Sequence, residues 1–233
     1  LVVLDEFTST IDRTVAQIGS AAVAKAVRRT PDKRLVAVTC HEDVEAWLQP
    51  EWVYRTDTQA FTWRGVQRRP PIRLEIARVG PEAWHLFRRA HYLSHVLHRA
   101  SACFLATVEG RPAAFTAVLA FPHPNRPGWR EHRTVCLPDF QGVGIGNALS
   151  AFVGGLYRVR GRPYRSTTSH PAMIRARLAS PDWRIVRRPS MVRQFKWAAS
   201  NRLTAGFEYV GPAFPDEARQ LGVSLKRMRV SAV

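Results

Sequence analysis

The sequence has few cysteines and no long apolar run. Its three cysteines, Cys40, Cys103 and Cys136, stand far apart in a chain of 233 residues and form no CxxC pair. This spacing supports neither a disulfide framework nor a cysteine-ligated zinc site, and it favours a reducing compartment. The sequence also lacks a secretory signal pattern and any apolar run that could span a membrane. We therefore expect a cytoplasmic chain without a membrane segment.

Acidic residues are scarce in the larger, C-terminal part of the chain. Residues 1–64 hold eight Lys and Arg against nine Asp and Glu, a net charge of −1, whereas residues 65–233 hold 27 against nine, a net charge of +18. Most of these cations are arginines, whose forked guanidinium groups suit phosphates. The excess is typical of a surface that binds coenzyme phosphates or nucleic acid, and also of one that only keeps a protein in solution.

Residues 1–64 alternate between strand and helix patterns. The run LVVL, residues 1–4, predicts a buried parallel strand that ends at Asp5 and Glu6. Residues 14–29 have the apolar spacing of a helix. The run RLVAVTCH predicts a second buried strand that ends at His41, and a short helix and a last strand follow it.

This segment resembles the second half of an ABC-type ATPase domain. LVVLDE resembles the Walker B strand, TSTID the D-loop, and VAVTCH the strand before the switch histidine. The resemblance implies that Asp5 and Glu6 serve magnesium and the attacking water, and that His41 contacts the γ-phosphate. It also implies that Asp12 contacts an opposing subunit, so a dimer through this part of the chain is a further expectation.

Two other motifs of such ATPases are missing. The chain has no GxxxxGK[ST] phosphate loop and no LSGGQ-like signature, so nothing in it cradles the β- and γ-phosphates. It also begins inside a strand-like run, without a methionine. We therefore expect residues 1–64 to be the C-terminal fragment of an ATPase domain that does not hydrolyse ATP by itself. ATP and Mg²⁺ are expected only with an intact, full-length ATPase domain.

A linker and a second domain follow. TWRGVQRRPP, residues 62–71, combines a glycine, a basic cluster and a Pro-Pro pair, and predicts a linker at 65–72. Residues 73–211 predict the order β-αα-β-β-β-α-β-α-β-β, with a helical stretch from Gly80 to about Arg99 that breaks near His91, and a hairpin turn at Glu109-Gly110. Residues 212–233 read as a basic C-terminal tail. The expected fold class is α/β, with a mixed, mostly antiparallel sheet flanked by helices and a small N-terminal α/β fragment.

Glycines gather where the fourth strand of this second domain meets its helix. In VCLPDFQGVGIG, residues 135–146, Gly142, Gly144 and Gly146 let a ligand approach the backbone and permit unusual φ angles. The loop N–H groups then converge at a helix N-terminus, which favours an anion such as a coenzyme pyrophosphate. Two alternatives stay open. One is a tight strand-to-helix turn in which the glycines allow close packing. The other is a dinucleotide-binding fingerprint, although that motif has the spacing GxGxxG and this run has GxGxG.

This glycine-rich connection between strand and helix, taken together with the order of strands and helices, resembles the [QR]xxGxG/A signature of the GNAT acyltransferase superfamily. The whole chain resembles fusions of ABC ATPases with an acetyltransferase domain, on runs such as HYLS and LPDFQGVGIG. The resemblance implies transfer from acetyl-CoA, or another acyl-CoA, to an amine by direct attack, with the pantetheine arm between splayed strands. It implies a backbone N–H near Leu137 on the thioester carbonyl. The implied cofactor-binding residues are Val135, Cys136, Leu137, Gln141, Gly142, Val143, Gly144, Ile145, Gly146 and Asn147.

Acid and base candidates are few. In HYLSHVLH, residues 91–98, the three histidines share a helical face, but the run lacks the glutamate of HExxH and we predict no metal site. His91 and Tyr92 either line the acceptor cleft or only pack and meet solvent. Asp139 either orients an amine or caps a turn, and Ser169 and His170 end the strand that faces the thioester. The strand position of Cys136 favours a core thiol over a nucleophile.

Two further functions stay open on this sequence. One is a GNAT-like enzyme that modifies a nucleic-acid base, because Trp129, Trp183 and Trp197 stand among arginines as on a phosphate-and-stacking surface. The other is a non-catalytic nucleic-acid-binding or regulatory module of the ATPase, since a fold does not dictate an activity.

Overall fold

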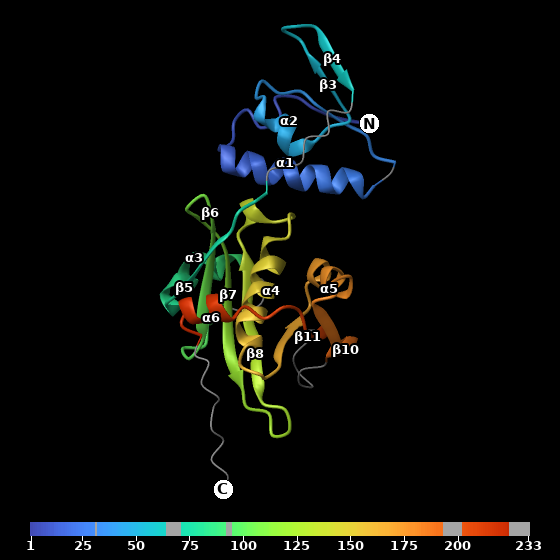
Figure 1. Ribbon diagram of the computed structural model, residues 1–233. Helices are drawn as coiled ribbons and strands as arrows, with labels where there is room; N and C mark the ends of the chain where they lie inside the picture. The colour runs from blue at the N-terminus through green and yellow to red at the C-terminus, as the bar shows by residue number, and fades with distance from the viewer. Residues whose placement is uncertain (31, 64–70, 92–94, 193–201, 224–233) are drawn as a thin grey trace. The chain divides into compact units, whose positions relative to one another are not determined.

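The computed structural model describes residues 1–30, 32–63, 71–91, 95–192 and 202–223 (Figure 1). The chain forms two compact units. Unit 1 comprises Leu1–Glu75, Thr107–Ala113 and Leu137–Ile145, and unit 2 comprises Ile76–Ala106, Ala114–Cys136 and Gly146–Val233. Most of the linker predicted at 65–72 lies outside the described residues. Within the described part of the chain, no helix is both long and apolar enough to cross a bilayer.

Unit 1 contains the elements predicted for residues 1–64, with two differences. Strands β1 (Val2–Leu4) and β2 (Leu35–Ala37) pair in parallel, and helices α1 (Arg13–Arg28) and α2 (Asp43–Leu48) follow them. The prediction that β1 is buried was wrong, because Val2 and Val3 are 48% and 58% exposed in this two-stranded sheet. The predicted last strand is a hairpin, β3 (Trp52–Arg55) with β4 (Ala60–Trp63).

Helix α1 begins and packs as its sequence dictates. The carboxylate of Asp12 accepts hydrogen bonds from the N–H groups of Thr14 and Val15 at 2.9 and 3.3 Å, which caps the helix start. Ala16 and Ile18 are buried, and Arg13 forms an ion pair with Asp43 at the start of α2. This packing holds the helix pair of unit 1 together.

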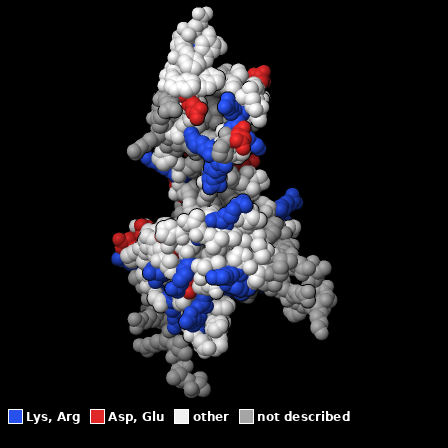
Figure 2. Space-filling view, turned by 90° about the vertical axis from the view of Figure 1, so that its right-hand side faces the viewer, with Lys and Arg blue, Asp and Glu red and all other residues white. Residues whose placement is uncertain are grey.

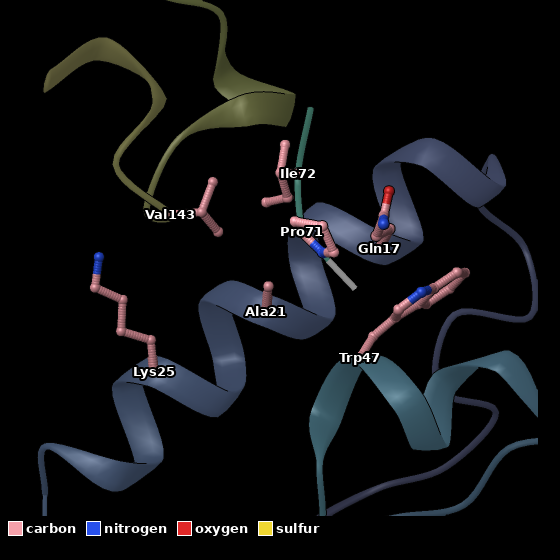
Figure 3. A pocket seen from close by; sticks show the side chains of 7 residues that line it. All are labelled: Gln17, Ala21, Lys25, Trp47, Pro71, Ile72 and Val143. Atoms are coloured by element: carbon pink, nitrogen blue, oxygen red, sulfur yellow. The ribbon is translucent and has the colours of Figure 1, made fainter. Parts of the chain in front are cut away.

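A pocket lies within unit 1 (Figure 3). Seven residues line it: Gln17, Ala21, Lys25, Trp47, Pro71, Ile72 and Val143. Val143 is the one residue of this set that the sequence predicts to bind a cofactor. None of the five predicted catalytic residues lines this pocket.

Unit 2 holds most of a seven-stranded sheet in the order β10-β11-β9-β8-β7-β6-β5 (Figure 1). The strands are β5 (Glu75–Val79), β6 (Ala102–Val108), β7 (Arg111–Phe121), β8 (Gly128–Cys136), β9 (Tyr164–Thr168), β10 (Trp183–Val192) and β11 (Arg202–Tyr209). β8 and β9 run parallel, whereas β7–β8, β9–β11 and β10–β11 are antiparallel. Glu109 and Gly110 form the β6–β7 turn with φ angles of 50° and 75°, as the sequence predicts.

Helices cover both faces of this sheet. Trp84 and Phe87 of α3 (Trp84–Phe87) stack on Phe115 of β7, with ring centroids 5.4 and 5.5 Å apart. The next residue, Thr116, points to the opposite face, which carries α4 (Ile145–Arg158) and α5 (Pro171–Leu178). Gly155 permits close packing of α4, because a Cβ there would lie 2.3 Å from the Phe214 ring.

Of the helical stretch predicted from Gly80 to about Arg99, with a break near His91, only the part before His91 is helical among the described residues. The segment divides into a 3₁₀ turn (Pro81–Ala83), α3, and a second 3₁₀ turn (Arg88–Ala90), after which His91 is extended. Residues 95–100 are not helical. The shared helical face predicted for His91, His95 and His98 is therefore wrong. Within the predicted basic tail, a short helix α6 (Pro215–Gln220) forms after Pro215.

Candidate functional site

The glycine loop has the backbone geometry that only glycine adopts easily. Strand β8 ends at Cys136, a 3₁₀ turn spans Pro138–Phe140, and α4 begins at Ile145. Between them, Gly142 and Gly144 have φ angles of 88° and 106°. A side chain at either position would be strained. The loop therefore delivers backbone, and no bulky side chains, to the N-terminus of α4, where helix N–H groups favour an anion.

Strands β8 and β9 part after a short stretch of pairing. Among the described residues, their parallel ladder consists of Trp129 with Tyr164 and Arg130 with Arg165. β8 continues beyond this point to Cys136, still paired with β7 through Ala114. In its C-terminal half, β8 is therefore still paired with β7 along one edge. Its other edge faces the side on which β9 has diverged.

One hydrogen bond shows toward which neighbouring strand the backbone N–H and C=O groups of each β8 residue point. The N–H of Leu137 donates to the carbonyl oxygen of Ala113 at 2.9 Å, so Leu137 faces β7. The Leu137 N–H itself therefore bonds within the sheet, and the backbone N–H that the resemblance implies near Leu137 stays a prediction. Successive strand residues alternate in direction, so the backbone of Cys136 faces the side of β9.

The Cys136 thiol is embedded against the start of α4. Its burial raises its pKa to about 11, although a hydrogen bond from the Gly146 N–H opposes this. At neutral pH the group is a thiol, and a thiol is a weak nucleophile. Cys103, which is buried where Cys136 is half-buried, has its pKa raised to about 11 by the same cause. This agrees with the sequence-based interpretation of Cys136 as a core thiol.

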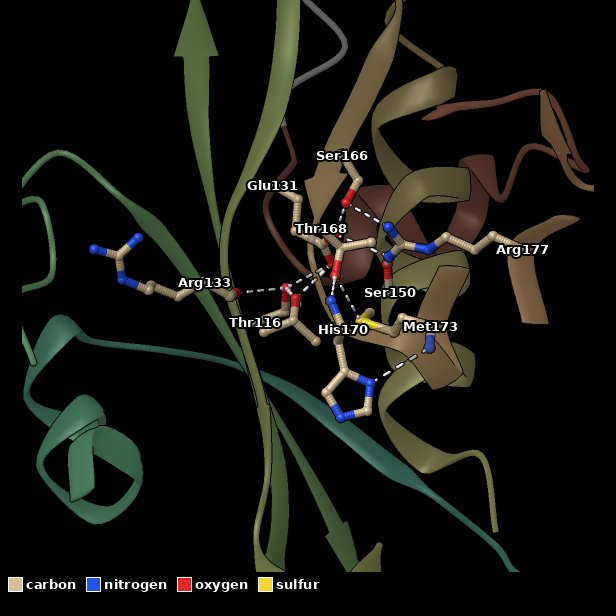
Figure 4. Close-up of polar contacts among 10 residues, drawn as sticks. Thr116, Glu131, Arg133, Ser150, Ser166, Thr168, His170, Met173 and Arg177 are labelled. Carbon is tan, nitrogen blue, oxygen red and sulfur yellow. Dashed lines mark hydrogen bonds and ion pairs between the residues drawn. The ribbon is translucent and has the colours of Figure 1, made fainter. Parts of the chain in front are cut away.

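A buried ion pair bridges β8 and α5 next to the point where β8 and β9 part (Figure 4). Nη2 of Arg177 donates to Oε2 of Glu131 at 2.9 Å and to Oγ of Ser150 at 2.7 Å, and Nη1 donates to Oγ of Ser166. The hydroxyls of Ser166 and Thr134 donate to the Glu131 carboxylate. The two charged side chains are only 1% and 6% exposed.

The sequence does not reveal this network, because its members are spread over 47 residues. Burial alone would raise the pKa of Glu131, but the Arg177 guanidinium and the surrounding hydroxyls hold that pKa below its ordinary value. The Arg177 guanidinium also stacks over Trp183 at 4.2 Å from the ring centroid. A carboxylate held this way is a poor general base, and its role is to connect β8, β9, α4 and α5.

The predicted catalytic residues fall in different places. His91 is buried edge-on against Trp84, with ring centroids 5.6 Å apart, and Tyr92 lies outside the described residues. Asp139 is exposed in the turn after β8. Ser169 is half-buried, and exposed His170 caps α5 through Nδ1, which accepts from the Met173 N–H at 3.4 Å (Figure 4). Their catalytic roles stay predictions.

The sequence analysis did not single out His132, which lies close to His98 and His91. His132 sits at a bulge of β8, between the pairs of Glu131 and Arg133 with β7. Its Nε2 accepts from the N–H of His98 at 3.3 Å, and burial lowers its pKa to about 4, with repulsion from Arg133, His98 and His91 adding to the effect. His132 is therefore neutral at physiological pH.

Replacing His132 by glutamine is expected to make the free energy of unfolding depend less on pH under acidic conditions. The unfolded-state pKa of histidine is about 6.5, whereas that of folded His132 is about 4. Between these values the unfolded state binds more protons, so stability falls as the pH drops from 6.5 toward 4. Urea midpoints across this range should fall less steeply for His132→Gln than for the wild type. Equal slopes would contradict the burial of His132, and His85→Gln, at an exposed position, is the control.

The four residues of the ATPase-type motif lie in unit 1, near the ends of its first elements. Asp5 and Glu6 are exposed directly after β1, and Glu6 has a φ of 48°, unusual for a residue other than glycine. Asp12 caps α1, and the N–H of His41 donates to the Thr39 hydroxyl at 3.1 Å. In the described part of the chain, no group of three or more His, Cys, Asp and Glu is arranged to hold a metal ion.

No protein-family model matches the chain, and no curated protein matches its sequence. Among solved structures, the ribosomal-protein-S18-alanine N-acetyltransferase from Escherichia coli is 16% identical, with a TM-score of 0.44 over 62% of this chain and 97% of that one. A GNAT-family acetyltransferase from Streptococcus pneumoniae is 13% identical, with a TM-score of 0.44 over 60% and 100%.

A third similar structure is a Bacillus subtilis acetyltransferase in complex with CoA. It is 12% identical, with a TM-score of 0.44 over 60% of this chain and 98% of that one. All three are acetyltransferases. With identities below 25% and TM-scores below 0.5, however, they assign neither an activity nor a substrate to this chain.

Proposed function

We propose that this chain is an acyl-CoA-dependent N-acyltransferase of the GNAT type, with acetyl-CoA as the simplest donor. One observation carries the proposal: a parallel strand pair that parts after two residue pairs, with a glycine loop at the start of the next helix. Parted strands offer backbone groups to an extended ligand, and the helix start offers N–H groups to its phosphates. A coenzyme A thioester has both features, a long amide-bearing arm and a pyrophosphate.

In this proposal, the loop from Gln141 to Asn147 holds the pyrophosphate and the edge of β8 at Cys136 meets the pantetheine arm. The backbone N–H of Cys136 takes the role that the resemblance implies for an N–H near Leu137, and polarises the thioester carbonyl. The acceptor nitrogen attacks that carbonyl, a C–N bond forms and the C–S bond breaks. The amine loses a proton, and the coenzyme thiolate gains one.

The candidates for the side chains that move these protons are chosen by where they lie in the fold. His170 and Ser169 follow the C-terminal end of β9, and Asp139 follows the end of β8. His91 lies beside Trp84 on the face covered by α3. Glu131 is not assigned as the base, because Arg177 and three hydroxyls hold it as a carboxylate.

We also propose that residues 1–64 derive from an ABC-type ATPase domain. The support is the parallel pair β1–β2, with Asp5 and Glu6 after β1 and His41 after β2, in the order that the family's motifs require. Asp5 would serve magnesium and Glu6 the attacking water.

The test of the acyltransferase proposal is transfer from labelled acetyl-CoA to a panel of amines: polyamines, lysine peptides and peptides with a free N-terminus. We expect release of coenzyme thiol together with an acetyl group on one amine class. Because Cys136 is a half-buried thiol whose pKa is raised to about 11, Cys136→Ser should keep this rate, and no acetyl group should remain on the protein after quenching. An acetylated Cys136 would contradict direct attack. Absence of acetyl-CoA binding would contradict the whole proposal.

A further inference from the structure

Six arginines of unit 2 lie around one end of its sheet, where β8 and β9 begin and α4 ends, and they are named here the arginine surface. They come from the β7–β8 connection and β8, from the end of α4 and the following loop, and from the start of β9. The residues are Arg126, Arg130, Arg158, Arg160, Arg162 and Arg165. Arg126, Arg130 and Arg158 are exposed, and the other three are half-buried.

Aromatic rings and backbone contacts hold these arginines in place. Arg130 and Arg165 both lie over the ring of Phe121, with Cζ 5.9 and 5.7 Å from its centroid. Arg165 also donates to the carbonyl oxygen of Arg126 at 3.1 Å. On the other side, Arg160 lies 4.3 Å over the ring of Trp129. Stacking through the flat guanidinium face leaves its edge, which carries the N–H groups, turned outward.

Carboxylates that could balance this charge are few in the sequence around it. Between Arg111 and Pro181 the chain has ten arginines and only two acidic residues, Glu131 and Asp139. Glu131 is buried with Arg177, and Asp139 follows the opposite end of β8. Glu208 lies 4.0 Å from Arg165 but also pairs with Arg184 at 2.8 Å. Figure 2 shows another side of unit 2, the one that carries α5 and β10, and there too blue Lys and Arg side chains are prominent and red ones are few.

The coenzyme does not account for this surface. The glycine loop precedes Ile145, the first residue of α4, whereas Arg158 is the last residue of that helix and Arg160 and Arg162 follow it. A helix of 14 residues separates its two ends by about 21 Å at 1.5 Å per residue. The pyrophosphate proposed at the loop is therefore held at the other end of α4.

Favourable interaction with the helix dipole explains only part of the cluster. Cations at the C-terminus of α4 are stabilised by the last carbonyl groups, which applies to Arg158 and its neighbours. Arg126, Arg130 and Arg165 belong to strands and to a loop, where no such field acts. Like charges gathered this closely repel one another, so the cluster is most favourable with a polyanion bound.

We propose that the arginine surface binds the phosphate backbone of nucleic acid without reading its sequence. Trp129 and Phe121 are covered by guanidinium groups, so neither ring is available for base stacking, and the outward N–H groups meet phosphates instead. This corrects the stacking surface predicted from Trp129, Trp183 and Trp197. Trp183 is only 8% exposed against Arg177, and Trp197 lies outside the described residues. The proposal is independent of the acyltransferase activity.

The test is fluorescence anisotropy of the full chain with a labelled 20-base-pair DNA duplex and a single-stranded RNA of equal length. If the six arginines each neutralise one phosphate, affinity for the duplex should fall about 1,000-fold between 50 and 200 mM salt. The triple variant Arg126→Gln, Arg158→Gln, Arg162→Gln keeps the three arginines that stack on rings. It should bind at least tenfold more weakly, and its log–log salt slope should be lower by about 2 to 3.

The matched control removes the same charge elsewhere. Arg29, Lys33 and Arg34 are exposed in unit 1, and replacing all three by glutamine should leave the affinity and the salt slope close to the wild-type values. Equal weakening by the two triple variants would overturn the proposal, because net charge alone would then explain binding. Preferential binding to anionic vesicles over both nucleic acids would also overturn it. Unchanged acetyl-CoA binding in the surface variant is expected, and it separates this result from the acyltransferase test.

Discussion

Replacing Gly144 by alanine is expected to weaken acetyl-CoA binding by about 10- to 100-fold. Gly144 has a φ of 106°, a conformation that costs about 1–3 kcal/mol for a residue with a side chain. A Cβ at this position would meet no atom within 4 Å, so the core is not disturbed and the loop relaxes instead. The N–H groups that we assign to the pyrophosphate then lose their common direction. Isothermal titration with acetyl-CoA measures the loss.

Gly146→Ala is the matched control for this experiment. Gly146 lies within α4 and has no positive φ, and its added Cβ would lie 3.7 Å from the Cβ of Cys136, an ordinary contact. This variant should bind acetyl-CoA close to the wild-type level and unfold at a similar urea concentration. If Gly144→Ala binds as well as Gly146→Ala, the loop is only a turn between β8 and α4, and the assignment of the coenzyme site fails.

Replacing Glu131 by glutamine is expected to destabilise the fold by about 3–5 kcal/mol, because the buried Arg177 would lose its counter-charge. Arg177 is 1% exposed and has no access to water as a substitute. Replacing both residues, by Glu131→Leu and Arg177→Met, should recover much of the loss, since no uncompensated charge then stays buried. Urea unfolding of the single and double variants measures both values. Equal losses for single and double variants would contradict direct coupling of the two charges.

The same pair predicts a pH dependence. The pKa of Glu131 is held below its ordinary value in the folded protein, so its contribution to stability is fully present above the unfolded value of about 4.3. This contribution is lost as the pH falls through the lower pKa of the folded state. The double variant should therefore lose less stability at acid pH than the wild type.

This network explains why β8 and β9 can part without collapsing the sheet. Where strands diverge, the ladder hydrogen bonds stop, and something else must hold the two strands at a constant separation. Glu131 of β8 and Ser166 of β9 are joined by a direct hydrogen bond, and Arg177 ties both to α5. The residues that hold the strands apart are therefore polar, buried and joined to one another by hydrogen bonds, which gives this region one defined geometry.

Local patterns were sufficient for most elements of the chain. The apolar spacing of residues 14–29 predicted α1, and the strand patterns around Glu109-Gly110 predicted the β6–β7 hairpin. The order of strands and helices in residues 73–211 also followed from period and turn residues alone. The prediction failed after His91, where helical spacing continues but the described residues 95–100 are not helical. Spacing does not show which residues must bury, and His91 leaves the helix to pack against Trp84.

The glycine loop could be located from the sequence because its chemistry is local. Backbone that must adopt φ angles near 90° requires glycine, and a run of three alternate glycines before an apolar helix is visible without any tertiary information. Leu137 shows the limit of that reasoning. A backbone N–H near it was assigned to a ligand, but its own N–H donates to Ala113, because hydrogen-bond direction depends on register with a neighbouring strand.

Composition likewise revealed an excess of arginine but not its arrangement. The sequence established a mixed α/β chain, a glycine loop before a helix and a charge far above what one coenzyme needs, since these depend on neighbouring residues and on counting. Only the folded chain brought Glu131 to Arg177, His132 to His98, and Arg126 to Arg165. Each of these pairs joins residues more than 30 positions apart. All of them form because the packing of strands and helices, rather than local preference, decides which distant side chains meet.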